Sequence, residues 1–193
     1  KCLSDAGFFV DIADISGKHT MRSLIERVVT LQGVAQNLPR TCTSLMDATS
    51  CFFPQYIINQ IHTPLFILNS AYDKVQINLS VAPASADPYG FWSACKKNHA
   101  HCNADEMTVL QGLRNQVLKA VGSFSMSRQN GLFINSCFTH CQSESQTTWF
   151  AENSPALGNT RIAVAVGDWF FDRSAFKARD CAYPCDKTCH HSN

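Results

Sequence analysis

The sequence has few charged residues and no long apolar segment. Lys, Arg, Asp and Glu together make up 16% of its 193 residues, and the formal net charge is +1. No basic stripe indicates a nucleic acid partner, and no acidic tail indicates a solvating segment. The longest apolar runs, such as 64–68, are far shorter than the roughly 20 residues of a membrane-spanning helix. We therefore expect neither a nucleic acid nor a membrane as partner.

A secretory leader, an internal repeat and a recognisable linker are also lacking. The chain begins with Lys1 rather than Met, and residues 1–7 resemble the middle of a folded segment. A secreted protein begins in this way after cleavage of its leader, and so does a fragment of a longer protein. Hydrophobic residues make up 45% of the sequence, enough for one core, so we expect one domain or part of one.

Cysteine, in contrast, is abundant. The ten cysteines stand at positions 2, 42, 51, 95, 102, 137, 141, 181, 185 and 189. Such density is typical of an oxidising compartment and a disulfide framework, and the tripeptide Asn78-Leu79-Ser80 is a glycosylation sequon. We expect a secreted or luminal protein in which neighbouring cysteines pair, Cys42 with Cys51 and Cys95 with Cys102. Cys2 is expected to have a partner upstream of the chain.

Short apolar runs alternate with amphipathic segments along the sequence. The runs predict strands at 8–12, 63–68 and 131–134. Spacings of three and four residues predict helices over 20–36, with Leu24, Val28, Leu31 and Ala35 on one face, over 105–124 after an Asp105 cap, and near 162–166. One or two helical turns are expected at 55–60. This alternation predicts an α/β fold with a largely parallel sheet.

Two of the predicted strands are followed by titratable side chains. Asp73 follows the strand at 63–68, and His140, bracketed by Cys137 and Cys141, follows the strand at 131–134. The loops at the carboxyl ends of parallel strands converge on one crevice. An acid followed by a histidine is the chain order of the last two members of an α/β-hydrolase triad. The alternatives are that Asp73 caps a turn and that His140 is a structural residue beside a disulfide.

The nucleophile of such a triad is not recognisable. A Gly-x-Ser-x-Gly elbow must precede the acid, and residues 1–73 contain none. Cys137 or Cys141 as a thiolate nucleophile is a minor alternative, because it requires an unpaired sulfur with a lowered pKa.

Other groups of Cys, His, Trp and Asp residues are weighed between a metal-binding or substrate-binding role and a structural one. A zinc site at Cys181, Cys185, Cys189, His190 and His191 is weighed against disulfides, which fit the four-residue steps better. His99 and His101 are expected to be exposed loop residues rather than ligands. Trp92, Trp149 and Trp169 either line a carbohydrate surface or pack in the core. Asp168 is expected to be structural.

Five segments resemble plant pectin acetylesterases, which are relatives of the animal carboxylesterase Notum. They are Asn69-Ser70-Ala71-Tyr72-Asp73, Asp87-Pro88, Ser136-Cys137-Phe138-Thr139-His140-Cys141-Gln142, Val166-Gly167-Asp168-Trp169-Phe170-Phe171 and Asp180-Cys181-Ala182-Tyr183-Pro184-Cys185. The resemblance covers essentially the whole chain. One departure is Val75, where the family usually has tryptophan.

The resemblance implies a secreted, cell-wall α/β-hydrolase that removes O-acetyl groups from homogalacturonan without a cofactor. It implies Asp73 as the triad acid and His140 as the general base. It also implies that the elbow serine and part of the oxyanion hole lie upstream of Lys1. We therefore expect residues 1–193 to be the C-terminal part of one esterase domain, inactive and poorly soluble alone. The alternative is a truncated, wall-associated module without activity, and the oligomeric state stays open.

Overall fold

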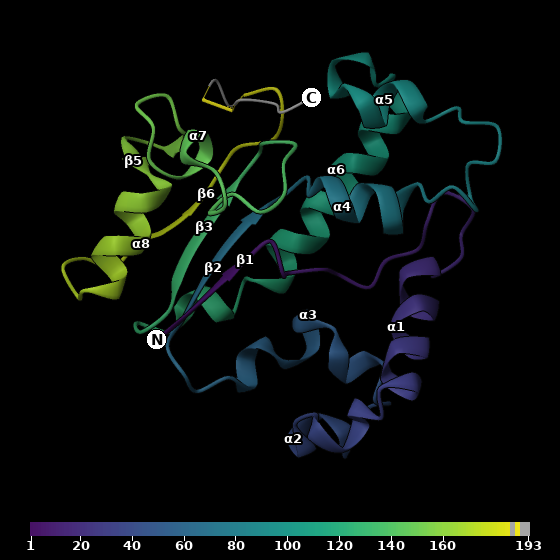
Figure 1. The fold of residues 1–193 in the computed structure, drawn as a ribbon, viewed down its shortest axis with the longest axis horizontal. Coiled ribbons are helices and arrows are strands. Elements are labelled where there is room, and N and C mark those ends of the chain that lie inside the picture. The colour runs from purple at the N-terminus through teal and green to yellow at the C-terminus, as the bar shows by residue number, and fades with distance from the viewer. Residues whose placement is uncertain (186–187, 190–193) are drawn as a thin grey trace.

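The computed structural model describes residues 1–185 and 188–189. Its centre is a parallel sheet in the order β1-β2-β3-β6 (Figure 1). The strands of this sheet are β1 (Cys2–Asp5), β2 (Leu65–Ser70), β3 (Gly131–Asn135) and β6 (Lys177–Arg179). A small antiparallel ribbon of β4 (Ala156–Leu157) and β5 (Thr160–Arg161) lies beside it. The predicted class, α/β with a largely parallel sheet, is confirmed.

Helices connect the strands. They are α1 (Thr20–Leu31), α2 (Arg40–Thr43), α3 (Pro54–Ile57), α4 (Lys74–Gln76), α5 (Ser93–Lys97), α6 (Ala104–Ala120), α7 (Gln146–Trp149) and α8 (Ile162–Phe170). The helices predicted over 20–36, over 105–124 and near 162–166 are confirmed as α1, α6 and α8, although α1 ends earlier, at Leu31, and α6 ends at Ala120. The helical turns predicted at 55–60 are confirmed as well. The cap of α6 was predicted wrongly: Asn103 accepts from the backbone of Glu106, and the Glu106 side chain accepts from the backbone of Asn103. This reciprocal capping box satisfies two helix-end donors, which Asp105 alone does not do.

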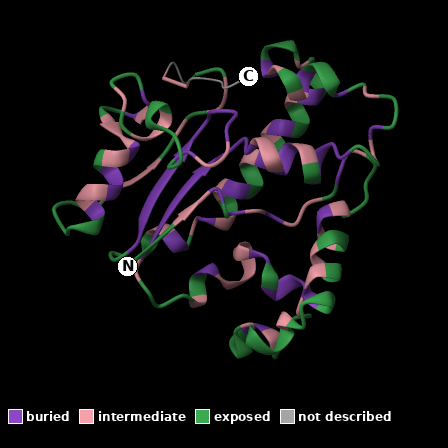
Figure 2. Cartoon of the chain, viewed as in Figure 1, coloured by how far each residue is buried: buried purple, intermediate pink, exposed green. Residues whose placement is uncertain are grey.

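Both faces of the sheet are covered by helices. On one face, Ile67 and Ile134 belong to the apolar cluster that includes Leu110 and Val117 of α6. On the other, Phe66 packs with Ile162 and its neighbours in α8. Every residue of β2 and β3 is buried (Figure 2). Strands buried on both faces explain why these segments are continuous apolar runs rather than alternating ones.

The apolar face predicted for α1 was wrong. Leu24 and Leu31 are exposed, whereas Met21 and Val29 are buried. The helix carries two apolar stripes, and periodicity alone does not tell which one faces the core. In the observed orientation of α1, Nη1 of Arg22 forms an ion pair with Oδ2 of Asp11, 2.7 Å away.

The strand predicted at 8–12 is absent. The chain turns at Ala6, whose φ is +56°, and leaves the sheet as an extended segment. Its backbone amides at Phe8, Val10 and Asp11 donate to side-chain oxygens of Asn69, Gln76 and Gln55. Side-chain amides thus replace the strand ladder that the apolar run predicted.

Disulfides join Cys42 to Cys51 and Cys95 to Cys102, as predicted. Two more join Cys137 to Cys189 and Cys181 to Cys185, and Cys2 and Cys141 are free. The sequon lies within a helical turn, and its Ser80 hydroxyl is buried. No helix in the described part of the chain is both long and apolar enough to cross a membrane.

Candidate active site

Asp73 lies three residues past the end of β2, where it begins a helical turn. Its carboxylate accepts a hydrogen bond from the backbone N–H of Gln76, 2.9 Å away, and so caps α4. The Asp73 side chain is only 3% exposed. The turn-capping role weighed for this residue is therefore real, and it leaves the second carboxylate oxygen for another partner.

That partner is His140, five residues past the end of β3. Its Nδ1 lies 2.7 Å from Oδ2 of Asp73. The two strands are neighbours in parallel register, with Ser70 opposite Asn135, so both loops leave the sheet at the same edge. The structure therefore brings together the two side chains that the sequence selected.

Several bonds hold the two loops together. The backbone N–H of Ala71 donates to the carbonyl of Asn135 (2.8 Å), and that of Lys74 donates to the carbonyl of Thr139 (3.2 Å). The ring of Tyr72 stacks on Phe138 at 4.8 Å. These contacts fix the relative position of acid and histidine.

The geometry defines how the pair handles a proton. With Nδ1–H donating to the carboxylate, Nε2 of His140 is left as the proton acceptor. Burial raises the pKa of Asp73, while hydrogen bonds from His140 and from the Gln76 and Val75 backbone oppose the rise. The His140 side chain is 26% exposed, enough for a reacting group to approach it. Such a pair can take a proton from a nucleophile and return it to a leaving group.

A nucleophile for this pair is not found among residues 1–185 and 188–189. No hydroxyl of these residues hydrogen-bonds His140; the nearby Ser143 hydroxyl donates instead to Asp5. Cys137 is in a disulfide. Burial, followed by the negative charges of Glu144 and Asp5, raises the pKa of Cys141, which disfavours the thiolate that a nucleophile needs.

The remaining candidates make structural contacts. Cys181, Cys185 and Cys189 are all in disulfides, which removes the thiolates of the weighed zinc site; His190 and His191 lie outside the described residues. Asp168 forms an ion pair with Arg173. Trp92 and Trp169 are buried in the two cores, and Trp149 packs against the second.

Two features of the site were missed or misjudged from the sequence. His99 was expected to be exposed, but it is buried and stacks on Phe138 at 4.2 Å, whereas His101 is exposed as expected. Phe9 was assigned to a strand, but its ring lies against the His140 imidazole, with centroids 6.1 Å apart. No local pattern signals a contact between residues so far apart in the chain.

A parallel sheet flanked by helices on both faces, with an acid and a histidine after neighbouring strands, is the architecture of an α/β-hydrolase. Two crystal forms of the Drosophila Wnt deacylase Notum share this fold. Each superposes with a TM-score of 0.71 over 97% of this chain, at 18% and 17% sequence identity and covering 48% and 49% of the Notum chain. At this identity the likeness concerns the fold alone.

Sequence comparison is more specific. Residues 1–190 match the pectinacetylesterase family, and the chain belongs to that family. It is 42% identical to pectin acetylesterase 5 and 44% identical to pectin acetylesterase 11, both of Arabidopsis thaliana, over 100% and 98% of its length. These matches cover 45% and 49% of the two relatives. The chain therefore spans about half the length of the curated relatives it matches.

Proposed function

We propose that this chain supplies the acid and base of a serine carboxylic ester hydrolase that removes O-acetyl groups from pectin. The observation that carries the proposal is the 2.7 Å contact between His140 Nδ1 and Asp73 Oδ2 in a member of the pectinacetylesterase family. In homogalacturonan the substrate bond is an acetate ester of a sugar hydroxyl. Membership in the family supports ester chemistry, and the pair supports the acid–base part of it.

The proposed mechanism has two steps. In the first, a serine hydroxyl attacks the acetyl carbonyl, and its proton passes to Nε2 of His140 while Asp73 stabilises the imidazolium. The imidazolium then gives this proton to the departing sugar oxygen, which leaves an acetyl-serine. In the second step water attacks the acetyl group, His140 takes and returns a proton in the same way, and acetate is released. This route requires no cofactor.

The serine is proposed to lie outside this chain, in the upstream part of one shared esterase domain. Residues 1–73 contain no elbow sequence, and the chain spans about half of its relatives. The edge strand β1 pairs only with β2 among the described strands, and Cys2 and Cys141 are free. These features fit a sheet and a disulfide set that continue into that upstream part.

The proposed location is the cell wall, outside the cell, and the four disulfides support the secreted part of this proposal, because such bonds persist in oxidising compartments. The second candidate function is an inactive, wall-associated module, favoured by the absent elbow. The coding sequence upstream of Lys1 discriminates the two. An open reading frame with a Gly-x-Ser-x-Gly elbow supports the esterase, whereas a signal peptide without an elbow supports the module.

The direct test measures acetate release from acetylated pectin by the protein that includes the upstream part. His140→Ala is expected to lower kcat by about three orders of magnitude or more, as loss of a triad member does, with the fold intact by circular dichroism. The matched control is His101→Ala, which removes an exposed histidine and should leave kcat unchanged. Turnover retained in His140→Ala rejects the assignment. The 193 residues alone are expected to release no acetate.

A further inference from the structure

The extended segment at 8–11 is held by buried side-chain amides on both sides of Phe9. Before Phe9, the Phe8 N–H donates to Oδ1 of Asn69 at 3.2 Å. After it, Gln76 binds both backbone groups of Val10: Oε1 accepts from the N–H at 3.2 Å, and Nε2 donates to the carbonyl at 2.6 Å. Gln76 is 0% exposed and Asn69 is 1% exposed. Buried, two-way bonds of this kind are hard to replace with water.

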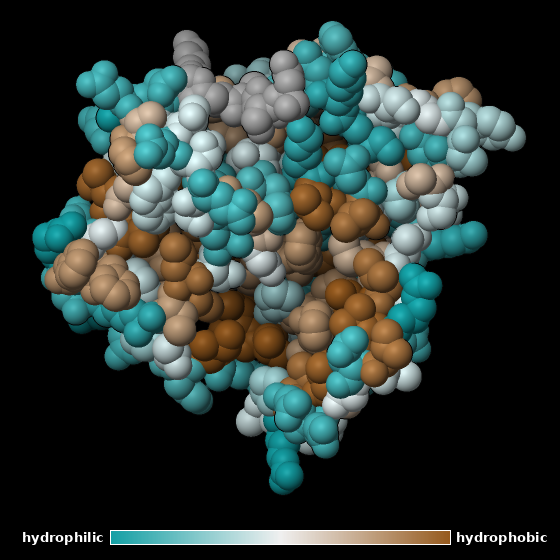
Figure 3. All heavy atoms as spheres, in the orientation of Figure 1, coloured by the Kyte–Doolittle hydropathy of each residue, from teal (hydrophilic) through white to brown (hydrophobic). Residues whose placement is uncertain are grey.

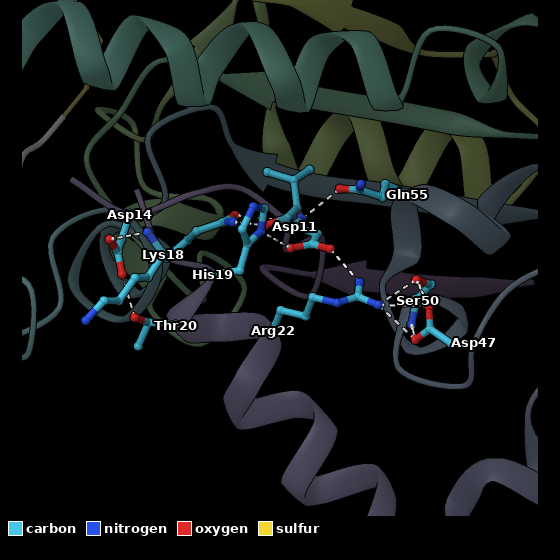
Figure 4. A network of polar contacts seen from close by, with 11 residues as sticks. Asp11, Asp14, Lys18, His19, Thr20, Arg22, Asp47, Ser50 and Gln55 are labelled. Atoms are coloured by element: carbon cyan, nitrogen blue, oxygen red, sulfur yellow. Dashed lines mark hydrogen bonds and ion pairs between the residues drawn. The ribbon is translucent and has the colours of Figure 1, made fainter. Parts of the chain in front are cut away.

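The far end of the segment is fixed by charges. The Asp11 carboxylate binds Nη1 of Arg22 at 2.7 Å and Nδ1 of His19 at 2.9 Å. Its backbone N–H donates to Oε1 of Gln55 at 2.8 Å. Figure 4 shows Asp11 at the centre of these contacts, between Arg22 and Gln55. Phe9 therefore lies in a short segment that is held by hydrogen bonds and ion pairs on both sides.

The Phe9 ring packs on the His140 imidazole, with ring centroids 6.1 Å apart and planes inclined by 24°. His140 has one hydrogen bond among the described residues, through Nδ1 to Asp73. A single bond fixes one ring atom and leaves the imidazole free to tilt about it. A neighbouring aromatic face removes that freedom.

We propose that Gln76 is a positioning residue for both members of the pair. Its backbone N–H holds Oδ1 of Asp73, and its side chain holds Val10, so that Phe9 stays against His140. The catalytic consequence rests on the proposed function, whereas the positioning itself does not. The side-chain bonds keep the imidazole in the orientation in which Nδ1–H meets the carboxylate.

The test observes the imidazole directly, by NMR of the 15N-histidine-labelled protein that includes the upstream part. The His140 signal is identified by its loss in His140→Gln, and the exchange rate of the Nδ1 proton with solvent is measured. Gln76→Met keeps the side-chain length and the backbone N–H but removes both bonds to Val10. Phe9→Leu removes the ring alone and serves where Gln76→Met does not fold. Both are expected to speed exchange several-fold to about tenfold, the range that corresponds to one lost aromatic contact.

Asn130→Leu is the matched control. Asn130 is another buried amide that binds the backbone, accepting from the Leu65 N–H at 3.3 Å, but it does so at the opposite end of β2. It should lower the unfolding midpoint as Gln76→Met does and leave the Nδ1 exchange unchanged. Unchanged exchange in both Gln76→Met and Phe9→Leu, or equal acceleration in the control, overturns the proposal.

An activity measurement separates this proposal from the proposed function. In the protein with its upstream part, Gln76→Met should lower kcat and leave KM nearly unchanged, because the orientation of the base affects the chemical step. Faster Nδ1 exchange without any fall in kcat would retain the positioning role and reject His140 as the base. Slower turnover without faster exchange would reject the positioning role instead.

Discussion

At the scale of single residues, the surroundings of Asp73 act on its pKa in opposite directions. The carboxylate is buried, which disfavours its charged form, yet it accepts hydrogen bonds from His140 and from the Gln76 and Val75 backbone, which favour that form. The net result is a pKa above the ordinary value of 3.8, with burial as the largest cause. Burial of the charged carboxylate lowers the free energy of unfolding, as is common for titratable groups at functional sites.

The sign of this cost gives a pH prediction. Because the folded state binds the Asp73 proton more tightly than the unfolded state, the free energy of unfolding should fall as pH rises from about 4 through the raised pKa. Asp73→Asn keeps an oxygen for the Gln76 N–H and removes the titration. It should unfold at higher urea concentration than the wild type at neutral pH, with the difference vanishing at low pH. Urea unfolding series between pH 3 and 7, on the protein that includes the upstream part, measure this.

Glu152→Gln, at an exposed carboxylate, is the control for the loss of one negative charge and should leave the urea midpoint at neutral pH unchanged. An Asp73→Asn protein that is less stable than the wild type at every pH contradicts the prediction.

The two members of the pair were predictable from the sequence, but their surroundings were not. Asp73 and His140 each follow a short apolar run, and neighbouring parallel strands bring their loops to one edge. Gln76 and Phe9 carry no such local signal, because their roles depend on contacts across 66 and 131 residues of chain. The free thiol of Cys141 was likewise missed, since spacing does not determine which cysteines pair.

At the scale of elements, the pairing of β2 with β3 depends on a close contact between Gly131 and Phe66. Gly131 begins β3 directly opposite Phe66 of β2, and a Cβ at Gly131 would lie 2.0 Å from Cδ2 of Phe66. Phe66 is 0% exposed and packs in the core shared with α8. Its ring therefore has little room to move, and glycine is required for the close contact rather than for a special φ.

The same substitution should have opposite effects at two glycines. Gly131→Ala inserts a methyl group into the Phe66 ring and should destabilise the chain by about 1–3 kcal/mol or more. Gly112→Ala, in the exposed middle of α6, meets no atom within 4 Å and should stabilise it by about 0.5–1 kcal/mol through helix propensity. Chemical unfolding of the two variants beside the wild type, each with the upstream part present, tests both signs. Equal effects at the two positions contradict this reading of the junction.

The elements themselves were largely predictable where tertiary context agreed with local pattern. β2, β3, α6 and α8 follow from apolar runs and helical spacing, and both sheet faces are buried as such runs predict. The segment at 8–12 was wrongly predicted because its backbone partners are side chains from three other elements. The face of α1 was wrongly predicted because two stripes compete and only the rest of the chain decides between them.

At the scale of the whole molecule, the sheet has an exposed edge. β1 is an edge strand, and its Leu3 is 40% exposed. Figure 3 shows apolar side chains gathered around a hollow on the face that carries β1 (compare Figure 1). An edge strand with apolar neighbours offers free backbone groups and an attractive surface to another chain.

We therefore expect the 193 residues to self-associate through β1 when they are expressed alone. Leu3→Lys places a charge on the edge and should raise the monomeric fraction, because lysines on edge strands oppose pairing between chains. Light scattering after size-exclusion chromatography, over a series of protein concentrations, measures this fraction. Leu45→Lys is the matched control: Leu45 is 85% exposed but lies outside the sheet, so this change should leave association as it is. A wild-type chain that stays monomeric and unfolds cooperatively, or an equal gain from both lysines, shows that association does not proceed through this edge.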